Sequence, residues 1–154
     1  MRRWLAAWLA GAVLAALAPA ARADPEDTDP DLAARDADYA AGRKALQARD
    51  WTTAVARLSR AEVRNPDHAD VQNDLGFAYR NLGKYDAAFK HYERALAIDP
   101  RHRGAHEYIG ETYLLVGDVK GAQRHLEALR AICLLGCEEL KDLDEAIAKY
   151  RAPK

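Results

Sequence analysis

The chain has 154 residues, of which 49% are hydrophobic and 31% charged, a composition typical of a single soluble domain. The formal net charge is −1, but Arg2, Arg3 and Arg22 precede residue 24 whereas all 24 acidic residues follow Ala23, so residues 24–154 have a net charge of −4. Nucleic-acid binding normally requires a basic stripe, so we do not expect residues 24–154 to bind nucleic acid.

Residues 1–23 have the pattern of a secretory signal peptide. A cationic start is followed by an apolar stretch over 4–17, a helix break at Pro19 and small residues at Ala21 and Ala23, after which we predict cleavage. The alternative is an uncleaved anchor, because the apolar run over positions 4–21 approaches the length that a membrane-spanning helix needs. Either interpretation predicts a periplasmic body exported by the general secretory route, with eukaryotic secretion as the alternative address. After cleavage, no stable membrane span is expected.

The next segment, residues 24–34, is predicted to be a flexible lead-in. It begins with the sequence DPEDTDPD, which is acidic, contains two prolines and is nearly free of apolar side chains.

An internal repeat follows. Gly42, Gly76 and Gly110 recur at a constant period of about 34 residues, and other columns with the same period agree in residue type. Among these columns are Ala54, Ala88 and Ala122 and the aromatic or apolar set Trp51, Tyr85 and Val119. The repeat predicts three copies over residues 35–68, 69–102 and 103–136.

The middle copy shows why the pattern predicts a pair of antiparallel helices. Leu75, Gly76 and Tyr79 share one face of a first helix, which Gly83 ends. Apolar side chains then recur at helical spacing over residues 85–95, and proline at position 100 stops the second helix. One hairpin cannot bury both of its faces, so the copies are expected to stack.

These residues resemble tetratricopeptide repeats, strongly in the second and third copies and more weakly in the first. The first copy has Ala45 where the others have tyrosine, and Arg49 where they have Gly83 and Gly117. The third has Leu134 where proline would match, so its second helix is expected to run on toward Gly136.

After Gly136, residues 137–150 place apolar side chains on one stripe of a helix with charged residues elsewhere. This pattern predicts a capping helix on the third copy. The fold class is therefore an all-α α-solenoid of three hairpins plus a C-terminal capping helix, and the chain resembles small periplasmic bacterial proteins of the tetratricopeptide family.

The two cysteines, Cys133 and Cys137, fall at the turn before the predicted cap. A disulfide there would hold the cap in an oxidising compartment. A free or exchange-active thiol pair and a soft-metal site such as Cu(I) remain as alternatives, the latter with His125 as the nearest candidate for a third ligand.

No catalytic pattern or cofactor motif emerges, so we predict that the protein is not an enzyme and has no cofactor. The histidines do not predict a metal site either. His68 and His102 are separated by one period of the repeat, as are His91 and His125, which places each pair at equivalent positions of successive copies rather than around one ion.

The remaining candidate is the concave surface that stacked first helices line, which in tetratricopeptide proteins receives an extended peptide or a helix. Phe77 is either exposed there for a partner or packed between neighbouring first helices. The lysine and asparagine residues that relatives use to clamp a carboxylate are absent, so binding to the C-termini of heat-shock chaperones is not implied. The residues that the resemblance places in the groove are Tyr39, Arg43, Asn73, Phe77, Arg80, Asn81, Glu107, Tyr108 and Glu111.

We therefore predict an exported interaction module or assembly factor that holds a partner protein or peptide in this groove. The hypothesis from a different class is a periplasmic thiol or copper carrier that acts through Cys133 and Cys137. Self-association is a third hypothesis, in which the partner is another copy of the chain.

Overall fold

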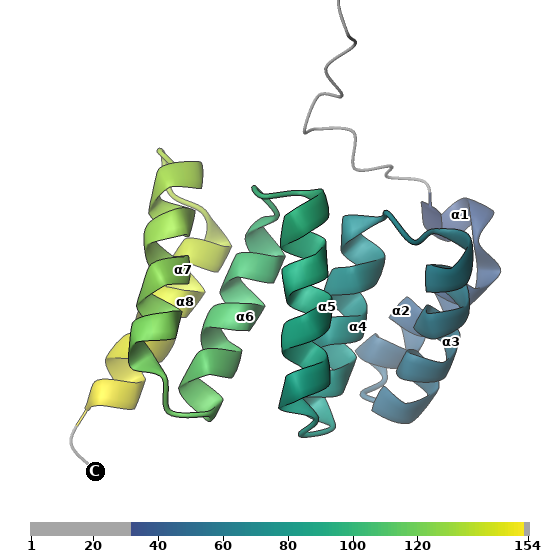
Figure 1. Ribbon diagram of the computed structural model, residues 1–154, viewed down its shortest axis with the longest axis horizontal. Helices are drawn as coiled ribbons and strands as arrows, with labels where there is room; N and C mark the ends of the chain where they lie inside the picture. Colours follow the sequence, from purple (N-terminus) through teal and green to yellow (C-terminus); the bar gives the residue numbers. More distant parts are fainter. Residues whose placement is uncertain (1–31, 153–154) are drawn as a thin grey trace, which may run out of the picture.

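The computed structural model describes residues 32–152, and the predicted signal peptide lies outside them. A single helical turn, α1, precedes seven longer helices, and the described residues contain no β-strand (Figure 1). The helices are α1 Leu32–Arg35, α2 Ala37–Gln47, α3 Trp51–Arg64, α4 Ala69–Asn81, α5 Tyr85–Ile98, α6 Arg103–Leu115, α7 Val119–Ile132 and α8 Glu138–Arg151.

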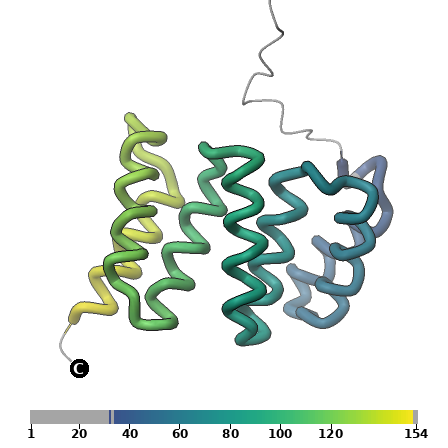
Figure 2. The backbone as a smooth tube through the Cα atoms, viewed as in Figure 1, coloured from purple at the N-terminus to yellow at the C-terminus, as the bar shows by residue number. Residues whose placement is uncertain are grey.

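Consecutive helices form three antiparallel hairpins, α2–α3, α4–α5 and α6–α7, which stack side by side from α1 to α8 (Figures 1 and 2). The second helices begin at equivalent positions of the repeat, Trp51, Tyr85 and Val119. This regularity confirms the all-α solenoid that the repeat predicts. The first helices α2, α4 and α6, joined by α8, form one layer, and we call its outer surface the first-helix face.

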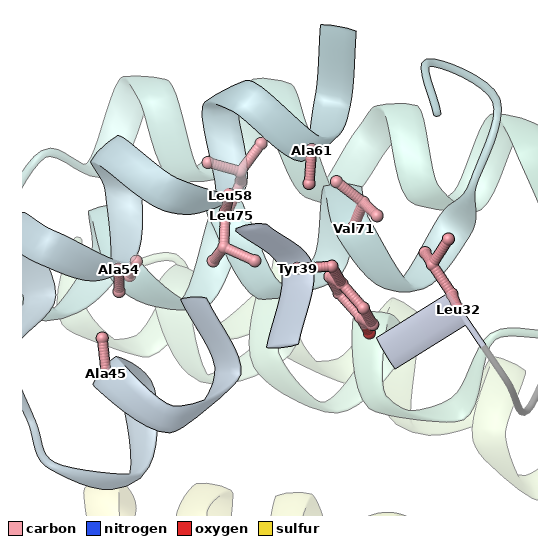
Figure 3. Close-up of a cluster of buried hydrophobic side chains, with 9 residues drawn as sticks. Leu32, Tyr39, Ala45, Ala54, Leu58, Ala61, Val71 and Leu75 are labelled. Atoms are coloured by element: carbon pink, nitrogen blue, oxygen red, sulfur yellow. The ribbon is translucent and has the colours of Figure 1, made fainter. Parts of the chain in front are cut away.

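The core runs between the two layers. Around the first hairpin, side chains from α1, α2, α3 and α4 point toward one another (Figure 3). Equivalent clusters follow at the α4–α5–α6 and α6–α7–α8 contacts. Each interface between hairpins is therefore part of the core, which explains why one hairpin would not be stable alone.

Glycines permit close approaches between helices, and Gly76 and Gly110 show two of them. A Cβ atom on Gly76 would lie 2.6 Å from ring carbons of Tyr92, and one on Gly110 would lie 2.7 Å from Leu143. The first contact closes a hairpin, as the sequence predicts. The second joins α6 to α8, so in the third hairpin the glycine accommodates the C-terminal helix.

The lead-in predicted for residues 24–34 is wrong at its end. Leu32 is buried in the first core cluster and Leu32–Arg35 form a helical turn. Buried Asp36 then caps α2 by accepting hydrogen bonds from the amides of Asp38 and Tyr39, and it also binds Arg64. Residues 24–31 lie outside the described part of the chain.

The extension of the third repeat's second helix toward Gly136 is also wrong. Helix α7 ends at Ile132, the position equivalent to Ile98 at the end of α5, and Gly136 takes a φ of +87° before α8 begins. The repeat geometry thus ends this helix without a proline. In α8, Leu143 and Ile147 are buried against α6 and α7, whereas Tyr150 is half-exposed.

Each hairpin joins its two helices through a polar pair at equivalent positions. Asp38 binds Arg57 in the first. In the second, Gln72 Nε2 donates to Glu62 Oε1 at 3.0 Å and to the Pro66 carbonyl at 3.4 Å, and Gln72 Oε1 accepts from His91 Nδ1 at 2.8 Å.

In the third hairpin, His106 takes the place of the glutamine. Its Nε2 donates to the Pro100 carbonyl, and its Nδ1 lies 3.0 Å from Nδ1 of His125. Since a carbonyl can only accept, neutral His106 carries its hydrogen on Nε2 and accepts from His125. The imidazole of His106 thus reproduces two of the three hydrogen bonds of the Gln72 amide.

Among residues 32–152, none of the helices is both long and apolar enough to cross a bilayer.

Candidate groove

The first-helix face carries two neighbouring pockets. The first has a volume of about 330 Å³ and lies where α2, α4 and α6 meet; we call it the polar pocket. The second has a volume of about 830 Å³ and lies at the C-terminal ends of α4, α6 and α8; we call it the apolar pocket. Five of the sequence-predicted groove residues line the polar pocket and three line the apolar pocket: Tyr39, Arg43, Asn73, Phe77 and Tyr108 in the first, and Arg80, Asn81 and Glu111 in the second.

An aromatic and cationic cluster separates the pockets. Phe77 packs between Trp51 and Tyr108, with ring centroids 5.8 and 4.9 Å away. The guanidinium of Arg80 lies over the rings of Phe77 and Tyr108, and it forms an ion pair with Glu111. Phe77 is therefore a packed, partly buried residue rather than a fully exposed one.

Two residues that line the polar pocket each have a buried oxygen atom with no hydrogen-bond partner among residues 32–152. These atoms are Oδ1 of Asn73 and Oδ2 of Asp74. The Tyr39 hydroxyl interacts with the Asp74 carboxyl, and Nε of Arg43 lies 3.8 Å from Oδ2, beyond hydrogen-bond distance. Burial raises the pKa of Asp74 to about 6.

Asp70, at the edge of the polar pocket, accepts a hydrogen bond from His102. The distance between His102 Nε2 and Asp70 Oδ1 is 2.9 Å, and His102 Nδ1 accepts from the Ala105 amide. His102 therefore caps α6 as the neutral Nε2–H tautomer. Its hydrogen bond holds the pKa of Asp70 below the usual range, so Asp70 is ionised at neutral pH.

Glu107 lines neither pocket but lies beside the cluster. Its side chain is buried, and no hydrogen bond within residues 32–152 satisfies its carboxyl. Burial and the nearby carboxyls of Glu111, Asp142 and Glu139 raise its pKa to about 8. This residue is therefore largely protonated at pH 7 in the protein alone.

The apolar pocket draws its side chains from two helices. Leu114 and Leu115 come from the end of α6, and Ala146 and Tyr150 come from α8. Leu115 is 56% exposed and Tyr150 is 48% exposed, which is unusual for large apolar side chains.

The comparisons with known proteins agree with this geometry. Residues 69–102 match the tetratricopeptide repeat family, over the middle hairpin. The middle hairpin is a tetratricopeptide repeat.

Curated relatives match on a longer stretch. The chain is 30% identical over 104 residues to small glutamine-rich tetratricopeptide repeat-containing protein 2 of Mycosarcoma maydis. This match covers 68% of this chain and 28% of that protein. It is 27% identical to the TPR repeat-containing thioredoxin TTL4 of Arabidopsis thaliana, over 67% of this chain and 14% of that protein. The chain thus spans less than a third of the length of these relatives.

Solved structures show the same tetratricopeptide fold. The TPR2B domain of yeast Sti1, solved in complex with a pHsp70 peptide, superposes with a TM-score of 0.70 at 19% identity, covering 77% of this chain and 95% of that one. MamA AMB-1 superposes with a TM-score of 0.58 at 26% identity, covering 68% of this chain and 57% of that one.

The cysteines lie apart from both pockets, in the turn after the third hairpin. The Cα atoms of Cys133 and Cys137 are 5.7 Å apart, and their sulfur atoms are at bonding distance. His125, the nearest candidate for a third metal ligand, instead contacts His106 and stacks on Tyr113. Within residues 32–152, no group of three His, Cys, Asp or Glu side chains is arranged to hold a metal ion.

Sequence reasoning missed the apolar side chains that line the apolar pocket. One signal was present: Leu115 stands where the first two hairpins have Gln47 and Asn81. The contribution of α8 could not be read in the same way, because it depends on how Leu143 docks this helix against α6. Two polar-pocket residues, Asp70 and Asp74, were likewise absent from the predicted groove.

Proposed function

We propose that this protein is an exported interaction module that holds a segment of a partner polypeptide in the polar and apolar pockets of its first-helix face. The observation that carries the proposal is the pair of pockets itself, since they combine unpartnered buried oxygens with half-exposed leucine and tyrosine side chains. An extended segment crossing α4 and α6 would donate hydrogen bonds to these oxygens and cover the leucine and tyrosine side chains.

Three structural features support a role in binding rather than chemistry. The pockets lie on a face built from successive helices, Arg80 is held rigidly between two rings and a carboxylate, and the aromatic residues beside it are already packed. A pre-formed surface of this kind loses little conformational entropy when a partner binds.

The proposed location is the bacterial periplasm, reached through the signal peptide of residues 1–23. The bonding distance between Cys133 and Cys137 suits an oxidising compartment, where a disulfide would tie α8 to α7. Mass measurement of the protein isolated from its host tests this part: a chain that begins at Asp24 is expected, and one that retains Met1 would contradict cleavage.

Helix α8 is proposed to act as the cap of the solenoid. Its buried side chains, Leu143 and Ile147, face the third hairpin, whereas Lys141, Asp144 and Glu145 are exposed. A charged outer surface disfavours the stacking of a further hairpin.

In vivo photo-crosslinking tests the groove. A photoreactive amino acid at Leu115, which lines the apolar pocket, is expected to give a discrete adduct in living cells. The matched position is Val63 on α3, which is 81% exposed but lies in the other helix layer. Adducts of equal yield from both positions would contradict a groove-specific partner.

A pair of substitutions provides the second arm of the experiment. Phe77→Ala combined with Arg80→Glu removes the ring and reverses the charge between the pockets, so the Leu115 adduct is expected to disappear. The circular dichroism spectrum is expected to remain that of a helical protein. An undiminished adduct would show that the partner does not use this face.

A further inference from the structure

The side chains of the two pockets indicate which chemical groups a bound segment needs. Asn73, which is 7% exposed, and Asp74 both line the polar pocket, and their buried Oδ1 and Oδ2 atoms have no hydrogen-bond partner among residues 32–152. Asp74 is ionised above its pKa of about 6, so both atoms then accept hydrogen bonds. A ligand group with several N–H donors on one centre would satisfy both.

The charges around these atoms favour a cationic donor. Asp70 and Asp74 lie in the polar pocket, and Glu107, Glu111, Glu139 and Asp142 interact farther along the same face. Arg80 is already paired with Glu111 and Arg103 with Glu139, whereas Lys149 lines the apolar pocket. Arg43, which is more than half exposed, lies 3.8 Å from Asp74 Oδ2. The two carboxyl groups of the polar pocket thus outnumber its one arginine.

The raised pKa values agree with this geometry. Burial raises the pKa of Asp74 to about 6, and burial with three neighbouring carboxyls raises that of Glu107 to about 8. Arg43 and Arg80 lower these two pKa values only in part, and an incoming ammonium or guanidinium at Asp74 would further stabilise its charged form.

The apolar pocket adds a second requirement. Leu114, Leu115, Ala146 and Tyr150 offer an apolar lining beside the Arg80–Glu111 pair. Asn73 and Arg80 lie two turns apart on α4, which is about 10 Å of helix, or the reach of about three extended residues. A cation in the polar pocket and an apolar side chain in the apolar pocket can therefore belong to one short segment.

We infer that the groove selects a basic segment of its partner, with a lysine or arginine head group donating to Asn73 Oδ1 and Asp74 Oδ2 and a large apolar side chain, at least about three residues away, filling the apolar pocket. The inference rests on the proposed function, because it specifies the ligand of the same face. It also predicts that binding releases a proton from Asp74, so that affinity increases as the pH rises from 5 to 7.

Selection from a random peptide library tests the charge preference directly. Phage-displayed random dodecapeptides are panned against the purified chain, and the retained sequences are compared with the unselected library. Lysine and arginine are expected to be enriched over aspartate and glutamate, with an apolar residue at a constant spacing from the basic one. The best sequence is then synthesised with a fluorescent label and titrated by anisotropy.

Three variants assign the effect to the pockets. Asp74→Asn keeps the side-chain shape and is expected to weaken binding about tenfold at pH 7.5 and to flatten the pH dependence. Leu115→Ser, at an exposed position, is expected to weaken binding without changing that pH dependence. Glu93→Gln on α5 makes the same charge change in the other helix layer and is expected to leave binding unchanged.

The outcomes separate this inference from the proposed function. Enrichment of acidic residues, or retained peptides without a charge preference, would overturn the basic-segment inference and leave groove binding in place. Failure to retain any peptide, together with equal crosslinking from Leu115 and Val63, would overturn both.

Discussion

At the scale of single residues, the three hairpin turns share a left-handed backbone conformation that a residue other than glycine adopts in only one of them. Arg49 has a φ of +57°, and the equivalent Gly83 and Gly117 have φ values of +71° and +84°. The left-handed conformation is unfavourable for a residue with a Cβ atom but not for glycine. The sequence already identified Arg49 as the exception to the repeat, and the turn adopts the repeat conformation nonetheless.

Arg49→Gly is therefore expected to stabilise the protein by about 0.5–1 kcal/mol, the relief of the left-handed conformation less the entropy that glycine loses on folding. Chemical denaturation measures the change. Arg49→Ala is the matched control, because it removes the exposed side chain but keeps the Cβ atom. Equal stabilisation by both substitutions would assign the effect to the side chain instead.

The imidazole pair of the third hairpin predicts acid sensitivity. Burial lowers the pKa of His106, and burial with the adjacent His106 and Arg124 lowers that of His125 to about 4. Both rings are neutral above pH 6.5, where the folded state incurs no penalty. As the pH falls from 6.5 toward 4, the unfolded chain binds protons that the folded chain excludes, and stability decreases.

His106→Gln is expected to reduce this acid loss by about 1 kcal/mol at pH 5, because Gln72 shows that an amide makes both hydrogen bonds at this position. Denaturant unfolding at pH 7.5 and pH 5 provides the comparison. The prediction would be wrong if the wild type and the variant lost the same free energy between these two pH values.

At the scale of helices, the docking of α8 depends on the glycine that faces it. Gly110→Ala would place a Cβ atom 2.7 and 2.8 Å from the terminal methyl carbons of buried Leu143. We expect a destabilisation of about 1–3 kcal/mol and faster amide exchange in α8, because the leucine must move. Gly104→Ala on the same helix meets its nearest atom at 3.6 Å and is expected to be tolerated. Thermal denaturation that ranks the two variants equally would contradict this account.

The turn before α8 offers a second test at this scale. A disulfide between Cys133 and Cys137 would stabilise the protein by about 2 kcal/mol in the chain-entropy model for so short a loop. The denaturation midpoint is expected to fall when a reductant is added. The double variant Cys133→Ser, Cys137→Ser is expected to show no response to reductant, and a wild type that is equally insensitive would indicate free thiols.

The helices could be predicted from the sequence in more detail than the groove. The constant period of the repeat located the second helices at Trp51, Tyr85 and Val119, and Gly76 predicted the contact that closes the middle hairpin. The groove also depends on contacts between hairpins, which no single repeat encodes. The sequence therefore left two alternatives for Phe77, and the structure distinguishes them by placing Trp51 and Tyr108 against it.

At the scale of the whole molecule, the polar pairs differ along the solenoid although their positions are equivalent. The first hairpin uses the Asp38–Arg57 ion pair, and hydrogen bonds from Arg57 and Arg64 hold the pKa of Asp38 below its usual range. The second uses an amide and one imidazole, and the third uses two imidazoles.

These differences predict the order in which the hairpins unfold in acid. An ion pair whose carboxylate stays charged persists at a pH where two buried neutral imidazoles already destabilise the folded state, because the unfolded chain binds the protons that they exclude. Repeat proteins can open one unit at a time, so acid would loosen the third hairpin while the first is still closed. Because the third hairpin carries Glu107, Tyr108 and Leu115, the chain would release a bound segment from that end before it lost its remaining structure.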